Sequence, residues 1–246
     1  MLDDLDALRL QLDWGADEAI GEAPLDRFAP RPAAAAPISA PISAPAKPAA
    51  PTRPTPQAET IEQLVAELER FEGCPLRLTA TSTVRPDGNP QARVVLVGDS
   101  PGSDDDRSGR AFSGAAGALL DRVLATAGLD RDAVLKTTLV PWRPPGGRPP
   151  TESEIQACLP FFHRLIAIVR PERLVLLGSL SLRSLTGGTE TMRRKRGSWV
   201  NVKIPLIDTE IPALPFPVLD QWLASPIAKQ RLWSDMITLH KATTTS

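Results

Sequence analysis

Short apolar runs alternate with helical repeats along the chain from residue 93 onward. Three of these runs have the length of buried strands: RVVLVG at 93–98, AVLKTTLV at 133–140 and RLVLLG at 173–178. Between them, apolar residues recur at helical spacing over 114–127 and 152–169. Because alternating strands and helices favour a parallel sheet covered on both faces, we predict an α/β fold. We expect a three-layer α/β/α sandwich with a short, mostly parallel central sheet.

The first 58 residues follow a different pattern. Residues 1–28 place leucines on one side of a helix, with aspartates between them, which predicts an N-terminal amphipathic helix or docking segment. Residues 29–58 are rich in proline and alanine and have few bulky apolar side chains, so we predict a disordered linker. The folded domain is then expected over 59–240, followed by a disordered tail at 241–246.

Composition narrows the class of protein. The chain has two cysteines, too few for a disulfide framework, and no run of about 18 apolar residues that would cross a membrane. Its first residues are acidic and lack the pattern of a secretory signal peptide. We therefore expect a cytoplasmic protein without membrane association. The N-terminal segment is a candidate attachment point for a protein partner.

The formal net charge of −1 conceals a basic region. Residues 136–203 hold 12 lysines and arginines against 4 acidic residues. A local excess of this size suggests a basic face that suits a polyanion. The alternative is a solvated surface whose balancing acids come from other segments.

The stretch from Gly98 to Asp121 carries the candidate chemistry. It begins where the first predicted strand ends and reads GDSPGSDDDRSGRAFSGAAGALLD. Its glycine spacing differs from that of dinucleotide- and phosphate-binding loops, and three aspartates at 104–106 would repel a phosphate. Adjacent carboxylates in a loop are usually only solvated, which argues against a metal site. The remaining interpretation is a pocket for a flat, uncharged ring that stacks on Phe112, against the alternative of an ordinary core aromatic.

The same stretch resembles the first motif of the family 4 uracil-DNA glycosylases, the iron–sulfur type. That motif reads Gly-Glu-Ala-Pro-Gly, an acidic pair, and then Gly-x-Pro-Phe-x-Gly-x-Ala-Gly-x-Leu-Leu-Asp. The matching segments of this chain are 98–102, 105–106 and 109–121. Further matches follow in the same order at 143–151, 157–161, 170–171, 193–199 and 226–235. The resemblance covers about residues 70–238 and implies the glycosylase fold.

The resemblance also implies a set of site residues, which the physics of base flipping supports. Gly98, Ser100, Phe112 and Thr138 would bind the flipped base, with the ring of Phe112 stacked on it, and Asp99 would be the catalytic carboxylate. A basic track would hold the DNA phosphates. Its candidates are Arg143, Arg148, Arg193, Arg194, Lys195 and Arg196. The last four stand in a predicted loop, for which a solvated surface is the alternative.

The chain departs from the family at the iron–sulfur cluster. By resemblance, the four cysteine positions fall on Phe71, Cys74, Trp142 and Cys158. Two thiolates do not hold a [4Fe–4S] cluster that expects four. We therefore predict no metal and no cofactor. We expect the two cysteines to pack together with Phe71 and Trp142.

Catalytic positions differ from the family as well. The asparagine of the second strand is Thr138, whose hydroxyl makes fewer hydrogen bonds than an amide, and the glutamate after the first glycine is Asp99. The histidine of the last motif falls on Phe216, or on Pro215 with a shifted gap. Losing such a donor typically costs about 10²–10³ in rate. The chain's own two histidines lie in helical patterns and are expected to be structural or on the surface.

Three functions remain open at this point. The preferred one is excision of uracil or a related deaminated base from DNA, by hydrolysis of the N-glycosidic bond after base flipping, with weakened activity. In it, Asp99 would orient water or stabilise positive charge on the sugar. The second is a non-catalytic DNA- or nucleobase-binding paralogue, acting as an interaction module in DNA repair. The third is a binder of small nucleobases or nucleosides with no role on DNA.

Overall fold

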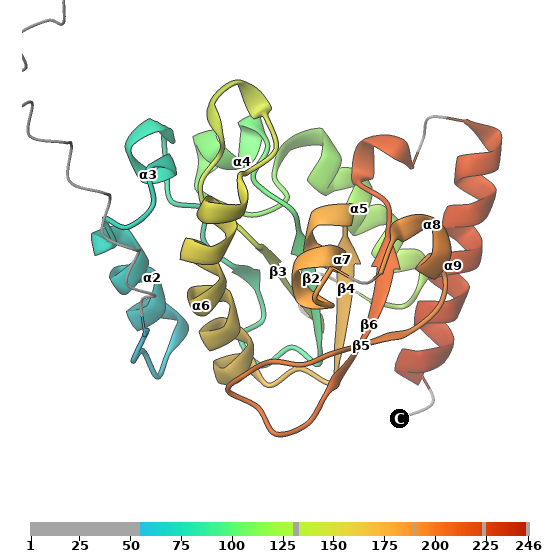
Figure 1. The fold of residues 1–246 in the computed structure, drawn as a ribbon. Coiled ribbons are helices and arrows are strands. Elements are labelled where there is room, and N and C mark those ends of the chain that lie inside the picture. Colours follow the sequence, from blue (N-terminus) through green and yellow to red (C-terminus); the bar gives the residue numbers. More distant parts are fainter. Residues whose placement is uncertain (1–54, 130–132, 189, 223–224, 245–246) are drawn as a thin grey trace, which may run out of the picture. The chain divides into compact units, whose positions relative to one another are not determined.

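A six-stranded sheet in the order β1-β3-β2-β4-β6-β5 forms the centre of the computed structural model (Figure 1). The structure describes residues 55–129, 133–188, 190–222 and 225–244. The strands are β1 (Asp87–Gly88), β2 (Val94–Gly98), β3 (Val134–Thr138), β4 (Arg173–Leu177), β5 (Val200–Val202) and β6 (Ile211–Phe216). The four central strands are parallel, and each edge strand is antiparallel to its neighbour. The prediction of a short, mostly parallel sheet is confirmed.

Helices connect the strands and cover the sheet. The α-helices are α2 (Ile61–Arg70), α3 (Leu76–Thr79), α4 (Ser103–Ser108), α5 (Gly114–Thr126), α6 (Glu152–Val169), α7 (Ser179–Leu185), α8 (Met192–Lys195) and α9 (Pro226–Thr244). In the described part of the chain, the short 3₁₀ helices η2 (Pro145–Gly147) and η3 (Leu219–Gln221) lie in loops. The start of α6 is a capping box, in which the side chains of Thr151 and Glu154 each accept a hydrogen bond from the other's backbone amide.

Each face of the sheet has its own apolar core, because side chains alternate along a strand. In β2, Val95 and Val97 belong to one core, whereas Val94 and Leu96 belong to the other. The first core is covered by α2, α6 and α7, and the second by α5 and α9. Figure 1 shows α2 beside α6, and the two helices are in contact. This arrangement is the predicted three-layer α/β/α sandwich.

The ends of the folded part differ slightly from the sequence-based boundaries. Ala58 is buried and its carbonyl oxygen accepts a hydrogen bond from Arg164, so ordered packing already includes residue 58. At the other end, α9 continues to Thr244, past the boundary placed at 240. The predicted helix over 1–28 and most of the predicted linker over 29–58 lie outside the described residues. Among the described residues, no helix is both long and apolar enough to cross a membrane.

Candidate functional site

A cleft of about 740 Å³ lies where the parallel strands end. Gly98 is the last residue of β2, Leu177 is the last of β4, and Val218 and Leu219 follow β6, so three neighbouring strands contribute to it. The segment 147–150, between β3 and α6, completes one side. The carboxyl ends of the strands are the edge at which parallel α/β sheets bind their ligands.

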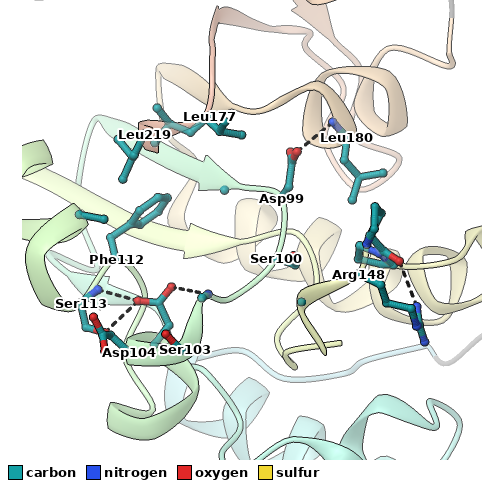
Figure 2. A pocket seen from close by; sticks show the side chains of 18 of the residues that line it. Asp99, Ser100, Ser103, Asp104, Phe112, Ser113, Arg148, Leu177, Leu180 and Leu219 are labelled. Atoms are coloured by element: carbon teal, nitrogen blue, oxygen red, sulfur yellow. Dashed lines mark hydrogen bonds between the residues drawn. The ribbon is translucent and has the colours of Figure 1, made fainter. Parts of the chain in front are cut away.

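The ring of Phe112 lines this cleft (Figure 2). The ring lies against the backbone of Gly98. A Cβ atom on Gly98 would lie 2.8 Å from Cζ of Phe112, closer than a side chain tolerates. Phe112 has a φ of 54°, a left-handed conformation that is unusual for a residue with a side chain. A Cβ on Gly117 would lie 1.7 Å from the carbonyl oxygen of Phe112. Two glycines therefore leave room for one half-buried aromatic residue beside the cleft.

The acidic run after Gly98 holds Phe112 in place, which the sequence analysis missed. Asp104, Asp105 and Asp106 belong to α4 and not to a flexible loop, and the last two are buried. Asp105 accepts hydrogen bonds from the amide and the hydroxyl of Ser113, at 2.6 and 2.9 Å. Ser113 is the N-cap residue of α5, but its hydroxyl donates to Asp105 and does not cap the helix. The residue next to Phe112 is thereby tied to α4.

Asp99 lines the cleft, and both of its carboxylate oxygens accept hydrogen bonds from the start of α7. Figure 2 shows the one from Leu180. The amide of Leu180 donates to Oδ2 at 3.1 Å and the amide of Ser181 donates to Oδ1 at 2.7 Å. The carboxylate comes this close because Gly178 has no side chain: a Cβ there would lie 2.2 Å from Oδ2. Asp99 thus links the end of β2 to α7. The half-buried Ser100 lines the cleft next to it.

The side chains that complete the cleft are mostly apolar. Leu177, Leu180, Val218 and Leu219 line it together with Phe112. Within the described part of the chain, neither histidine lines the cleft: the ring nitrogen Nδ1 of His240 lies 2.8 Å from the carbonyl oxygen of Ala127, and burial lowers the pKa of His163 to about 4. Phe216, one of the two positions on which the resemblance places the family's histidine, is fully buried. The cleft therefore suits a flat ring held by stacking and backbone groups.

Thr138, predicted to contact the base, is not among the residues that line the cleft. Gly98 and Thr138 are register partners in adjacent strands, and the methyl group of Thr138 would lie 3.5 Å from a Cβ on Gly98. Thr138 is buried and lines a separate small cavity together with Cys158. The structure brings together the other predicted contacts, Gly98, Asp99, Ser100 and Phe112, on one cleft.

Arg148 lines the cleft, but its guanidinium is paired with Glu154. Two hydrogen bonds join them, at 2.6 and 2.9 Å. The hydrogen bonds from Arg148 are the main cause that lowers the pKa of the buried Glu154 from 4.5 to about 2. Arg143 lies near the same segment, with one guanidinium nitrogen 3.6 Å from the place of a Cβ on Gly147.

The four basic residues at 193–196 differ in their surroundings: two are exposed, and two have acidic partners. Arg193 and Arg194 are exposed in α8, whereas Nε of Arg196 donates to the buried Asp235 of α9 at 2.7 Å. Lys195 pairs with Glu190 at 3.2 Å. Because β5 is antiparallel to β6, the segment before β5 lies toward the edge of the sheet that carries the cleft. The predicted loop is therefore a short helix with two exposed arginines.

The predicted packing around the two cysteines is confirmed. The sulfur atoms of Cys74 and Cys158 lie 4.0 Å apart, both residues are buried, and Trp142 belongs to the same core. The ring of Phe71 stacks on that of Trp142, with 6.4 Å between their centroids. The hydrogen bond from the Cys158 thiol to Cys74 lowers the pKa of Cys74 and raises that of Cys158.

These residues do not fit a four-iron cluster. Such a cluster takes four protein ligands, and the chain has only two cysteines. The other two positions are filled by aromatic rings. Within the described residues, no group of three or more histidine, cysteine or acidic side chains is arranged to hold a metal ion.

Comparison with known proteins agrees with this geometry. The family model of the uracil DNA glycosylase superfamily matches residues 85–237. A type-4 uracil-DNA glycosylase of Pyrobaculum aerophilum is 35% identical over 143 residues, which are 58% of this chain and 71% of that protein. Another, of Thermotoga maritima, is 36% identical over 57% of this chain and 74% of its own length. One of Sulfurisphaera tokodaii is 40% identical over 49% of this chain and 55% of its own length. The chain belongs to the uracil DNA glycosylase superfamily, and its folded domain is similar to the type-4 members.

Proposed function

We propose that this chain is a DNA glycosylase that excises uracil, or a related deaminated base, from DNA. The relatives reported above carry the name type-4 uracil-DNA glycosylase, which supports the reaction class. In this reaction, water adds to C1′ of the deoxyribose and the bond between C1′ and the base nitrogen breaks. The products are the free base and an abasic site in the DNA.

The observation that carries the proposal is the contact between Gly98 and Phe112. A base inside a duplex cannot be reached, so an enzyme that acts on it needs a pocket for the extruded ring. The half-buried ring of Phe112 lines a cleft at the strand ends and offers a face for stacking. Backbone groups near Gly98 and Ser100 would then bond the polar edge of the base, and apolar side chains such as Leu177 and Leu219 would contact its ring.

Asp99 is the proposed catalytic carboxylate, and its hydrogen bonds define what it can do. Both oxygens are held by amides of α7, which stabilise the anion. A fixed negative charge of this kind would stabilise positive charge on the sugar as the bond breaks. No histidine lines the cleft among the described residues, so the departing base would receive no imidazole hydrogen bond. We expect turnover that is slower by about 10²–10³ than with such a donor.

The DNA strand would be held by the basic side chains near the strand ends. Arg193 and Arg194 are the best placed, because both are exposed and project from α8 at the cleft edge of the sheet. Arg143 would add a contact beside the segment 147–150. Arg148, Lys195 and Arg196 already have acidic partners and would contribute less.

We further propose that the enzyme works without an iron–sulfur cluster. Supporting this, the chain has two cysteines where the family has four, and Phe71 and Trp142 fill the remaining positions. The pair of aromatic rings would take over the structural role of a cluster by packing. Iron and acid-labile sulfide analysis of protein purified without oxygen tests this: about four iron atoms per chain would contradict it.

The test of the proposed reaction is a panel of oligonucleotides that contain uracil, hypoxanthine or xanthine, single-stranded and paired. Strand cleavage after alkali reports the abasic site. We expect cleavage of the uracil strand by the native protein, loss of cleavage with Asp99→Ala, and no loss with Asp208→Ala. Asp208 is exposed and lies outside the cleft, so it controls for removal of a carboxylate. Salt-sensitive DNA binding without cleavage of any strand would instead indicate a non-catalytic DNA- or nucleobase-binding paralogue.

A further inference from the structure

The two cysteines form a close pair between segments that are distant in the sequence. Cys74 lies in the loop between α2 and α3, and Cys158 lies on α6, 84 residues later. Their sulfur atoms are 4.0 Å apart and in a hydrogen bond. Each residue is only 1% exposed. The chain contains no other cysteine, so these are its only two thiol groups.

The surroundings of the pair are unsuited to a metal ion. A structural zinc site takes four ligands from cysteine, histidine or carboxylate groups. Phe71 packs on Trp142 and on Phe161 beside the pair, with 5.0 Å between the Phe71 and Phe161 centroids. Apolar rings therefore stand where further ligands would be needed. Two neighbouring thiols without a metal have one common chemistry, which is oxidation to a disulfide.

The distance and the local structure allow that bond to form. A disulfide needs a sulfur–sulfur distance of about 2.05 Å, so the sulfurs must approach by about 2 Å. Cys74 stands outside regular helix, in a loop where a side-chain rotation or small backbone shift provides this movement. Cys158 also borders a small cavity of about 20 Å³, about the size of one water molecule.

We propose that Cys74 and Cys158 are a redox-active pair that hydrogen peroxide oxidises to a buried disulfide. One thiolate attacks a peroxide oxygen and the O–O bond breaks. Hydroxide departs, and the attacking cysteine becomes a sulfenic acid. The second thiolate attacks that sulfur, the S–O bond breaks, and the oxygen leaves as water. In total, two thiols and one peroxide give one disulfide and two waters. The hydrogen bond from Cys158 favours Cys74 as the first thiolate.

The disulfide would act on stability through the length of chain that it closes. It would join positions 84 residues apart, and a long closed loop removes more entropy from the unfolded chain than a short one. It would fasten the segment around α2 and α3 to α6, the helix that also carries Glu154, the partner of Arg148. The oxidised protein should therefore unfold at a higher temperature, by about 5 °C.

The test compares the full chain after treatment with dithiothreitol and after treatment with hydrogen peroxide. Intact mass and alkylation with iodoacetamide are measured under denaturing conditions. We expect the oxidised chain to lose two hydrogens, take up no iodoacetamide and melt about 5 °C higher, with full reversal by dithiothreitol. Cys74→Ser and Cys158→Ser should each abolish the mass change and the difference in melting temperature.

Three results would overturn the proposal, and none of them depends on DNA. The first is two thiols that still alkylate after peroxide treatment. The second is a gain of oxygen that dithiothreitol does not reverse, which means sulfinic or sulfonic acid and no disulfide. The third is an oxidised chain that melts at the same or a lower temperature than the reduced one. Because the serine variants could be unstable, the measurement on the native chain decides.

Discussion

The cleft and the cysteine pair are built in opposite ways. At the cleft, glycines keep the backbone bare, so that Phe112 lies against Gly98 and remains half-buried. Around the cysteines, large rings occupy the space, and Trp142 is fully buried. One region leaves space beside an aromatic ring, and the other is filled by aromatic rings packed near two thiols.

Removal of the largest ring at the cysteine pair should have the greatest effect on stability. Trp142 is 1% exposed and its indole donates to the hydroxyl of Thr83 at 3.0 Å. We expect Trp142→Ala to lower the free energy of unfolding by about 3–5 kcal/mol, measured by urea denaturation. Trp233, which is 57% exposed, is the matched control, and Trp233→Ala should cost about 0.5 kcal/mol or less. Equal losses in the two variants would contradict the view that a packed aromatic core supports this region.

A single methyl group should disturb the cleft far more than it disturbs the fold. Gly98→Ala would place its Cβ 2.8 Å from the ring of Phe112 and push the ring from its position. We expect excision of uracil to fall by about 10²-fold, because a displacement near 1 Å suffices for such a loss. In Gly102→Ala, the new Cβ would lie 3.7 Å from its nearest neighbour, Asp105, and activity should stay near that of the native chain. If both variants kept full activity, the contact at Gly98 would have no part in the reaction.

Neutralising the two exposed arginines of α8 should weaken DNA binding without affecting the cysteine region. For the variant with Arg193→Ala and Arg194→Ala, the slope of log affinity against log salt should fall by about 2, close to 1 for each phosphate contact. Lys203→Ala is the control variant and should leave the slope unchanged, because Lys203 follows β5 at the opposite edge of the sheet. Fluorescence anisotropy with a labelled oligonucleotide measures the slope. An unchanged slope in the double variant would remove α8 from the proposed DNA track.

The smallest expected effect concerns the ion pair between the two regions. Hydrogen bonds from Arg148 lower the pKa of Glu154 to about 2, so the pair stabilises the folded state above about pH 5. That contribution is lost as the pH falls toward 2 and Glu154 takes up a proton. Because Arg148 is 43% exposed, we expect only about 1 kcal/mol. Glu154→Gln should lower stability at pH 7 and flatten its dependence between pH 5 and 2, whereas Glu152→Gln, exposed on the same helix, should not.

The sequence predicted β2, β3 and β4 from their apolar runs, and α5 and α6 from the helical spacing of their apolar residues, because these signals are local. The role of the acidic run was missed because it depends on distant partners. Asp106 accepts hydrogen bonds from Thr81, 25 residues earlier, and no local pattern announces such a contact.

The same reason limits what could be predicted of the site. Gly98 and Phe112 were identified because their motif is continuous, and the structure brings them together. The partners of Asp99 on α7 lie 81 and 82 residues away, and only the fold shows that they bind its carboxylate. Thr138 is a neighbour of Gly98 in the sheet, but it lines another cavity, which the sequence motif does not indicate.

The most direct measurement is a crystal structure of the protein with an oligonucleotide that carries uracil on a sugar resistant to hydrolysis. The account predicts that the uracil ring leaves the base stack and lies on the face of Phe112, beside Gly98. A uracil that stays stacked in the DNA, or that binds elsewhere while the ring of Phe112 turns into the core, would contradict it.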